Sequence, residues 1–146
     1  MRLEVEPVPQ GSWGLSLANK LPKDKWDKIR HEVYKKADYT CSICEDTEVE
    51  LHAHETWRYS KTSRTKGKQT LVDIICVCKV CHDCIHFGRS VQVYPKDYIS
   101  KLVKHFCKVN GITKDQMDSY LEKVKKVSSK RADVTWTVVV GRRILL

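Results

Sequence analysis

Hydrophobic residues recur at helical spacing soon after the chain begins. Trp26, Ile29 and Val33 occupy positions i, i+3 and i+7 among charged residues, which predicts an amphipathic helix over residues 23–37. The preceding residues, 1–21, alternate only weakly between apolar and polar and contain two prolines close together. We therefore expect an extended N-terminal arm that packs on the rest of the chain.

Two longer helices are predicted in the last third of the sequence. The first spans about 95–109 and ends at the Asn110-Gly111 pair, because glycine readily adopts the left-handed conformation that ends helices. The second begins at Thr113, which forms a capping-box pattern with Gln116. These helices form a C-terminal extension of the fold.

The middle of the chain has β-rich segments instead. Residues 49–59 and 70–77 predict two strands of a hairpin, and a short helix is expected from 80 to about 87, ending at Gly88. A final strand is predicted over 134–138. Separate helical and β-rich segments predict an α+β fold.

Chain length and composition favour a single domain over residues 1–146. It divides into an arm and helix (1–40), a central core (41–90) and a helical extension with a terminal strand (91–146). No apolar run approaches the roughly 18 residues of a membrane span, and the start has no apolar signal-peptide core. We therefore expect a cytoplasmic protein with no membrane partner.

The net charge of +9 favours polyanionic partners, and nucleic acid is the commonest of these inside cells. Five basic residues and no acidic one lie between the two predicted strands, where we expect a loop. These candidate nucleic-acid contacts are Arg58, Lys61, Arg64, Lys66 and Lys68. Lysine and arginine in such a loop neutralise phosphates without reading sequence.

Seven cysteines, an odd number, argue against a disulfide framework. Two CxxC pairs, Cys41/Cys44 and Cys78/Cys81, instead have the spacing with which two thiolates of one turn reach the same ion. Four such ligands complete a closed tetrahedral site. The sequence therefore predicts one structural zinc ion.

A different pair, Cys81/Cys84, has the same spacing, and a thiol redox protein using it is a third, more distant reading. We favour Cys78 with Cys81, because that turn ends where the short helix starts. The remaining cysteines, Cys76, Cys84 and Cys107, are expected to be buried thiols.

Histidines suggest a second site. His82 and His86 are four residues apart on the short helix, so both imidazoles project from one face and can chelate a divalent cation. His54 and Glu55 lie on the preceding predicted strand, after His52. An imidazole and a carboxylate facing that helix form a plausible phosphodiesterase site. His31 and His105 are expected at the surface.

The segments CSIC (41–44), AHETW (53–57) and CKVCHDCIHFG (78–88) together resemble the HNH endonuclease family, in particular its small bacterial and phage members. Weaker similarity extends toward both ends of the chain. The resemblance implies a ββα-metal finger, in which a hairpin and a helix hold a catalytic divalent ion and the four cysteines hold zinc behind them.

By this resemblance His54 is the strand histidine that deprotonates water, and His82 and His86 hold the catalytic ion, for example magnesium, manganese, nickel or zinc. Two positions depart from the family pattern. Glu55 follows His54, so either His54 is the base or His54 is a ligand and Glu55 is the base. Asp73 stands where the family has asparagine, and aspartate can accept but not donate hydrogen bonds.

The sequence thus predicts a metal-dependent, HNH-like endonuclease that hydrolyses DNA. The alternative is a catalytically inactive zinc module of the same fold that binds nucleic acid or a protein partner. The two departures favour this alternative, while the presence of all three site histidines favours the enzyme.

Overall fold

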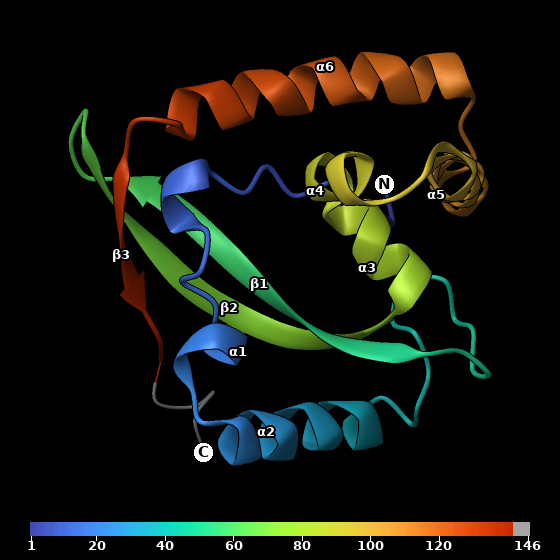
Figure 1. The fold of residues 1–146 in the computed structure, drawn as a ribbon, viewed down its shortest axis with the longest axis horizontal. Coiled ribbons are helices and arrows are strands. Elements are labelled where there is room, and N and C mark those ends of the chain that lie inside the picture. Colours follow the sequence, from blue (N-terminus) through green and yellow to red (C-terminus); the bar gives the residue numbers. More distant parts are fainter. Residues whose placement is uncertain (142–146) are drawn as a thin grey trace.

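The computed structural model describes residues 1–141, so residues 142–146 of the predicted domain lie outside it. The described chain is mixed α+β, as predicted, with six α-helices and one three-stranded sheet (Figure 1). The helices are η1 (Gln10–Ser12, a 3-10 turn), α1 (Leu17–Lys20), α2 (Lys23–Lys36), α3 (Lys79–Ile85), α4 (Phe87–Val93), α5 (Lys96–Asn110) and α6 (Lys114–Arg131). The strands are β1 (Leu51–Lys61), β2 (Lys66–Cys78) and β3 (Thr135–Val139).

A long antiparallel hairpin, β1 with β2, forms the centre of the molecule. Its pairing continues from Leu51 opposite Cys78 out to Lys61 opposite Gly67. The predicted basic loop over 58–69 is therefore wrong, because most of it is strand and only residues 62–65 form the turn.

The third strand explains why the outer hairpin is ordered. β3 pairs in parallel with the start of β2, from Lys66 opposite Thr135 to Thr70 opposite Val139. The ring of Trp136 lies so close to Gly67 that a side chain at position 67 would collide with it. The sequence predicted the bounds of this terminal strand to within one residue, but it did not predict the parallel pairing with β2.

The hairpin separates two hydrophobic clusters. On one face, Val77 packs with Leu3, α3, Phe106 of α5 and Met117 of α6. On the other, Leu71 and Ile74 pack with α1 and with the half-buried apolar side of α2. Successive strand residues point to opposite faces, so β2 supplies residues to both clusters.

Three helices formed as predicted. α2 spans nearly the predicted range, Gly111 caps α5 in the left-handed conformation, and the capping box of Thr113 and Gln116 opens α6. No helix within residues 1–141 combines the length and apolar character needed to cross a membrane.

Two local predictions were wrong. Gly88 does not end the short helix: the chain bends at His86 and continues as α4, in which Gly88 is the second residue. The Ser90 hydroxyl donates to the carbonyl of Asp83 across this bend (2.8 Å), which joins the two helices. The N-terminal arm also contains η1 and α1, and the side chain of Ser16 caps α1.

Candidate metal centres

Four cysteine thiols meet where the hairpin enters α3. One ligand atom from each of Cys41, Cys44, Cys78 and Cys81 lies within 4.8 Å of all the others. All are buried except Cys44, which is half-buried. The two CxxC turns thus converge as their spacing predicts, and the described structure has the donor set of a closed zinc site.

Local backbone bonds hold both cysteine turns in place. Cys78 is the N-cap of α3, and its sulfur accepts the backbone N–H of Cys81. The N–H of Ser42 donates to the carbonyl of Cys76 (2.9 Å), which joins the first turn to β2. Burial raises the pKa of the Cys44 thiol to about 12, so a cation is needed to hold that group as thiolate.

The remaining cysteines lie outside this cluster. Cys84 is fully buried and its thiol donates to the carbonyl of Leu102, so it is neither a cluster member nor an exposed redox thiol. Cys76 is buried and Cys107 is half-buried. The alternative Cys81/Cys84 pairing is therefore wrong.

His105 is not a surface residue as expected. Its Nε2 lies 3.1 Å from the sulfur of Cys81, and the side chain is half-buried between α5 and the cysteine cluster. An imidazole N–H donated to a zinc-bound thiolate stabilises the negative sulfur. His31, by contrast, is exposed on α2 as predicted.

Three histidines form a second cluster, between β1 and the C-terminal part of α3. His54 of β1 and His82 and His86 each offer a ligand atom within 4.8 Å of the others. The ring centroid of His54 lies 5.3 Å from that of His82 and 5.2 Å from that of His86. The sequence-predicted trio is therefore brought together.

Burial keeps these imidazoles neutral. It lowers the pKa of His54 to about 3 and that of His82 to about 2, and the pKa of His86 is lowered for the same reason. A neutral imidazole keeps the lone pair with which it binds a metal. The cluster thus has the protonation state that a transition-metal ion requires.

Glu6 is a site residue that sequence reasoning missed. Its Oε2 lies 3.5 Å from Nε2 of His54, and its backbone N–H donates to the carbonyl of Ile85 (2.8 Å). Burial raises the pKa of this carboxyl to about 7, although the backbone N–H of Trp57 donates to it. No local motif marks Glu6, because only the packing of the arm against α3 and β1 brings it here.

Glu55 does not join the histidines. Its carboxylate accepts the backbone N–H of Leu17 at the start of α1, on the opposite face of the hairpin from α3. Glu55 lines the same cavity as the histidines, but it is not a member of their cluster, and its carboxylate is bound to the backbone of α1. Adjacent residues of a strand project to opposite faces, so His54 and Glu55 cannot both face the helix.

Asp73 also lies away from the cluster. It is exposed beside a β-bulge, where Thr56 pairs with Asp73 and Trp57 pairs with Leu71. Its carboxylate accepts the N–H of Ile74 (2.8 Å), and its carbonyl accepts the hydroxyl of Thr56. Asp73 thus makes local contacts that shape the hairpin rather than contacts in the histidine site.

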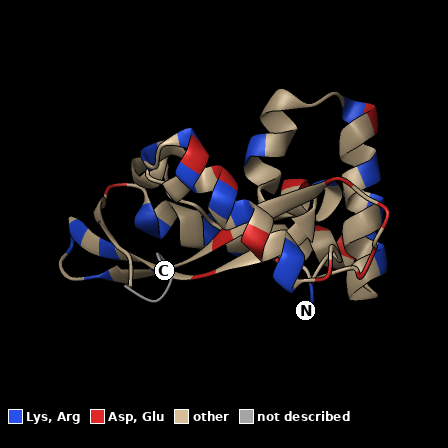
Figure 2. Ribbon diagram, turned by 90° about the horizontal axis from the view of Figure 1, so that it is seen from below, with Lys and Arg blue, Asp and Glu red and all other residues tan. Residues whose placement is uncertain are grey.

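The five basic residues are exposed, and all of them except Arg58 lie at the outer end of the hairpin, away from the histidines. At about 3.3 Å per strand residue, β1 extends roughly 23 Å from His54 to Lys61. Figure 2 shows Lys and Arg gathered at this outer end of the hairpin. Residues at this outer end therefore do not lie over the histidine cluster, whereas Arg58 is only four residues after His54 on β1.

A cavity of about 1050 Å³ opens beside the histidine cluster. Glu6, His54, His82 and His86 line it together with Arg89 of α4, and α6 contributes part of its wall. His54 is only 4% exposed, whereas His82 and His86 are half-buried. The cavity has room for water and a small anionic group beside the imidazoles.

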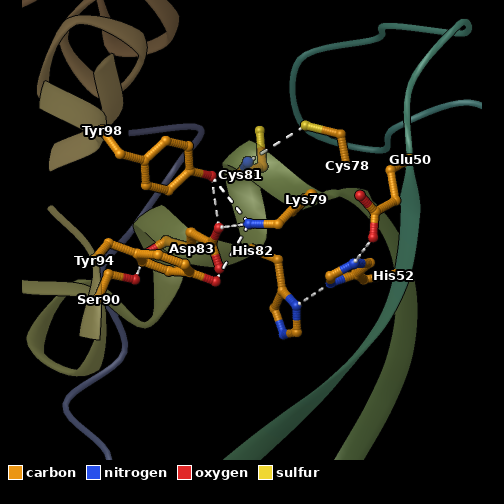
Figure 3. A network of polar contacts seen from close by, with 10 residues as sticks. All are labelled: Glu50, His52, Cys78, Lys79, Cys81, His82, Asp83, Ser90, Tyr94 and Tyr98. Carbon is orange, nitrogen blue, oxygen red and sulfur yellow. Dashed lines mark hydrogen bonds and ion pairs between the residues drawn. The ribbon is translucent and has the colours of Figure 1, made fainter. Parts of the chain in front are cut away.

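A polar network behind His82 fixes α3 against α5 (Figure 3). The ammonium of Lys79 lies 2.6 Å from the buried carboxylate of Asp83, and the Tyr98 hydroxyl donates to the same carboxylate (2.7 Å). The Tyr94 ring lies beside the Lys79 ammonium. Because these partners satisfy the buried charge, the helix that carries both site histidines is held in one position.

Comparisons with models of protein families, with curated proteins and with solved structures gave no match for this chain.

Proposed function

We propose that this protein is an HNH-like, metal-dependent endonuclease that hydrolyses phosphodiester bonds in DNA. The observation that carries the proposal is the cluster of His54, His82 and His86 at the wall of a cavity, beside a four-cysteine cluster. The order of elements, an antiparallel hairpin followed directly by a helix, supports the proposal because a ββα-metal finger has the same order.

The donor set fits the ions that this reaction class uses. Three neutral imidazoles suit nickel or zinc better than manganese or magnesium, which prefer oxygen ligands. A bound divalent ion would supply charge stabilisation at the phosphate and its leaving oxygen. The thiolates of the cysteine cluster would hold a separate structural zinc.

The chain's own residues have distinct roles in this proposal. The closeness of His54 to His82 and His86 supports a ligand role for all three. This is the ligand role that the second sequence-based assignment gave to His54, but that assignment made Glu55 the base. Glu6, the carboxylate beside His54, is then the group that accepts the proton of a water molecule in the cavity. Arg89, which lines the same cavity, would bind a phosphate oxygen.

DNA affinity would come from exposed basic side chains rather than from the site itself. Lys66 and Lys68 alternate with buried Gly67 and Gln69 along β2, so both lysines lie on one exposed face of the outer hairpin. A duplex that contacts this face and reaches the cavity would span less than one helical turn of about 34 Å, given about 23 Å of strand between them.

A plasmid-nicking assay tests the proposal. We expect supercoiled plasmid to be nicked with nickel or zinc, more weakly with manganese or magnesium, and not in the presence of a chelator. The controls are protein without added metal and a variant, His54→Ala, purified in the same way. Absence of nicking with every divalent ion would overturn the proposal.

The burial of His54 supports one alternative, a catalytically inactive module of the same fold that binds nucleic acid or a protein partner. With 4% of its surface exposed and Glu6 beside it, His54 is poorly accessible to a duplex. This alternative predicts salt-dependent DNA binding without cleavage under any metal condition.

A further inference from the structure

A chain of three side chains leads from the surface to the histidine cluster. Nε2 of His52 lies 3.1 Å from a carboxylate oxygen of Glu50, and Nδ1 of His52 lies 2.8 Å from Nδ1 of His82. Figure 3 shows Glu50, His52 and His82 in this line, with both contacts dashed. His52 is half-buried between β1 and α3, and no other role in the site accounts for it.

The chemistry of the three groups fixes where the protons lie. An ionised carboxylate only accepts hydrogen bonds, so Nε2 of His52 must carry the proton donated to Glu50. In a neutral ring the other nitrogen is then bare, and Nδ1 of His52 must accept. The only donor left for the 2.8 Å contact is the Nδ1–H of His82.

We propose that Glu50 and His52 are positioning residues that hold His82 in the Nδ1–H tautomer, leaving its Nε2 lone pair for a divalent cation. The inference rests on the ligand role of His82 in the proposed function. Hydrogen bonds of this kind fix both the ring orientation and the tautomer of a ligand histidine, and losing them typically weakens metal binding 10- to 100-fold.

The contact between the two rings also explains their orientation. The planes of His52 and His82 cross at 86°, and their ring centroids lie 5.0 Å apart. The two rings therefore approach each other edge-on and do not stack. The centroid distance exceeds the 2.8 Å between the two Nδ1 atoms, as expected when these nitrogens face each other between the rings. The cross-strand pairing of His52 with buried Val77 sets the position of His52 on β1.

The first test reads the tautomer directly. Long-range ¹H–¹⁵N NMR spectra of the zinc-loaded, ¹⁵N-labelled protein should show His82 with its proton on Nδ1. On adding a second equivalent of Zn²⁺, the Nε2 resonance should move to the metal-bound range while Nδ1 keeps its proton. A proton on Nε2 of His82 before addition, or metal on Nδ1 after it, overturns the proposal.

The second test measures affinity for that second Zn²⁺ by calorimetry, without nucleic acid. We expect Glu50→Ala and His52→Leu each to weaken binding at least about tenfold, while Glu48→Ala and His31→Leu, which change exposed residues of the same types, leave it unchanged. The double variant should bind no more weakly than His52→Leu, because Glu50 acts through His52. Unchanged affinity in folded His52→Leu overturns the proposal.

These outcomes are separable from failure of the nuclease proposal. A protein that binds the second Zn²⁺ with the expected tautomer but does not nick DNA retains this inference and loses only the enzymatic function. A protein that nicks DNA while His52→Leu binds Zn²⁺ normally retains the function and loses this inference.

Discussion

The cysteine and histidine clusters share the first turn of α3, yet they differ in almost every physical respect. Cys81 and His82 are neighbours in sequence and belong to different clusters. The cysteine cluster is enclosed by backbone and core, and its ligands come from two tight turns. The histidine cluster draws on β1, on α3 and its C-cap, and on the arm for the neighbouring carboxylate, and it opens onto a cavity.

This difference separates a structural centre from a chemical one. A closed four-thiolate site leaves no position for substrate, so its binding energy can only stabilise the fold. The histidine cluster leaves space beside its ligand atoms, and the carboxylate of Glu6 and the guanidinium of Arg89 line that space. The first cluster should therefore control folding and the second should control only activity.

Breaking the cysteine cluster should have the largest effect. Cys44→Ser or Cys81→Ser removes a zinc ligand, and since ligation energies of roughly 10–16 kcal/mol are folding energy in such small sites, the chain should be largely unfolded or aggregated. Elemental analysis should find about one tightly held zinc in the wild type and far less in the variants. Cys107→Ser, outside the cluster, is the control. A zinc-free protein that melts as cooperatively as the native one would contradict the assignment.

Removing a site histidine should abolish activity and spare the fold. His54→Ala is expected to lose plasmid nicking entirely, while zinc content and melting temperature stay near wild type. His82→Ala and His86→Ala should require more nickel or zinc for any remaining nicking. The exposed His31→Ala serves as control. Nicking that survives His54→Ala in a nuclease-free preparation would show that the cluster is not the site.

The two carboxylates near His54 should respond differently. Glu6→Gln is expected to lower the nicking rate by about 10² or more, the usual contribution of a general base, whereas Glu55→Gln should be nearly silent. Glu55 binds the backbone at Leu17, and a glutamine oxygen can still accept that bond. Single-turnover kinetics of both variants, with Glu4→Gln as control, measure the contrast. Equal losses of nicking rate in the two variants would show that Glu55 also acts in the site.

Removing the positive charges of the outer hairpin should weaken DNA binding without changing the rate at which bound DNA is cleaved. Replacing Lys61, Arg64, Lys66 and Lys68 by glutamine should flatten the plot of log affinity against log salt by up to about 0.9 for each lost phosphate contact. The effect should be similar for unrelated DNA sequences. An unchanged slope in filter-binding or anisotropy measurements would mean that DNA contacts another surface.

Acid should destabilise the zinc-loaded protein when no ion occupies the histidine site. The folded-state pKa values of His54 (about 3) and His82 (about 2) lie below the ordinary value of 6.5. The unfolded chain therefore binds these protons first as pH falls below 6.5, which favours unfolding. Glu6, with its pKa raised to about 7, takes up one proton when folded and offsets part of the loss between pH 7 and 4.5. Melting temperatures from pH 7 to 5 should fall, and less steeply in His54→Ala.

Much of the local structure was predictable because its signals lie within a single turn or helix. The spacing of the CxxC pairs, the capping box at Thr113 and the glycine after α5 each act over four residues or fewer, and all three appear in the structure. The pairing of His82 with His86 is equally local, since four residues return a side chain to the same helix face. Such short-range geometry follows from covalent structure and hydrogen bonding alone.

The outer hairpin shows how tertiary contacts override a composition signal. A run of basic, polar residues is typical of a loop. Here, however, Lys66 and Lys68 point to solvent while Gly67 and Gln69 turn inward, and the backbone of β2 is paired on both sides by β1 and β3. The partner strand lies more than sixty residues away, so no window of local sequence contains its contribution.

The sequence by itself determined which residues can hold metal, through thiol and imidazole spacing. Tertiary structure alone decided what surrounds them: Glu6 beside His54, His105 against Cys81, and Glu55 turned toward α1. The physical reason is that a ligand pair within one turn is set by local backbone geometry. Contacts between an arm, a strand and a helix instead depend on which hydrophobic faces pack together, and that packing is a property of the whole chain.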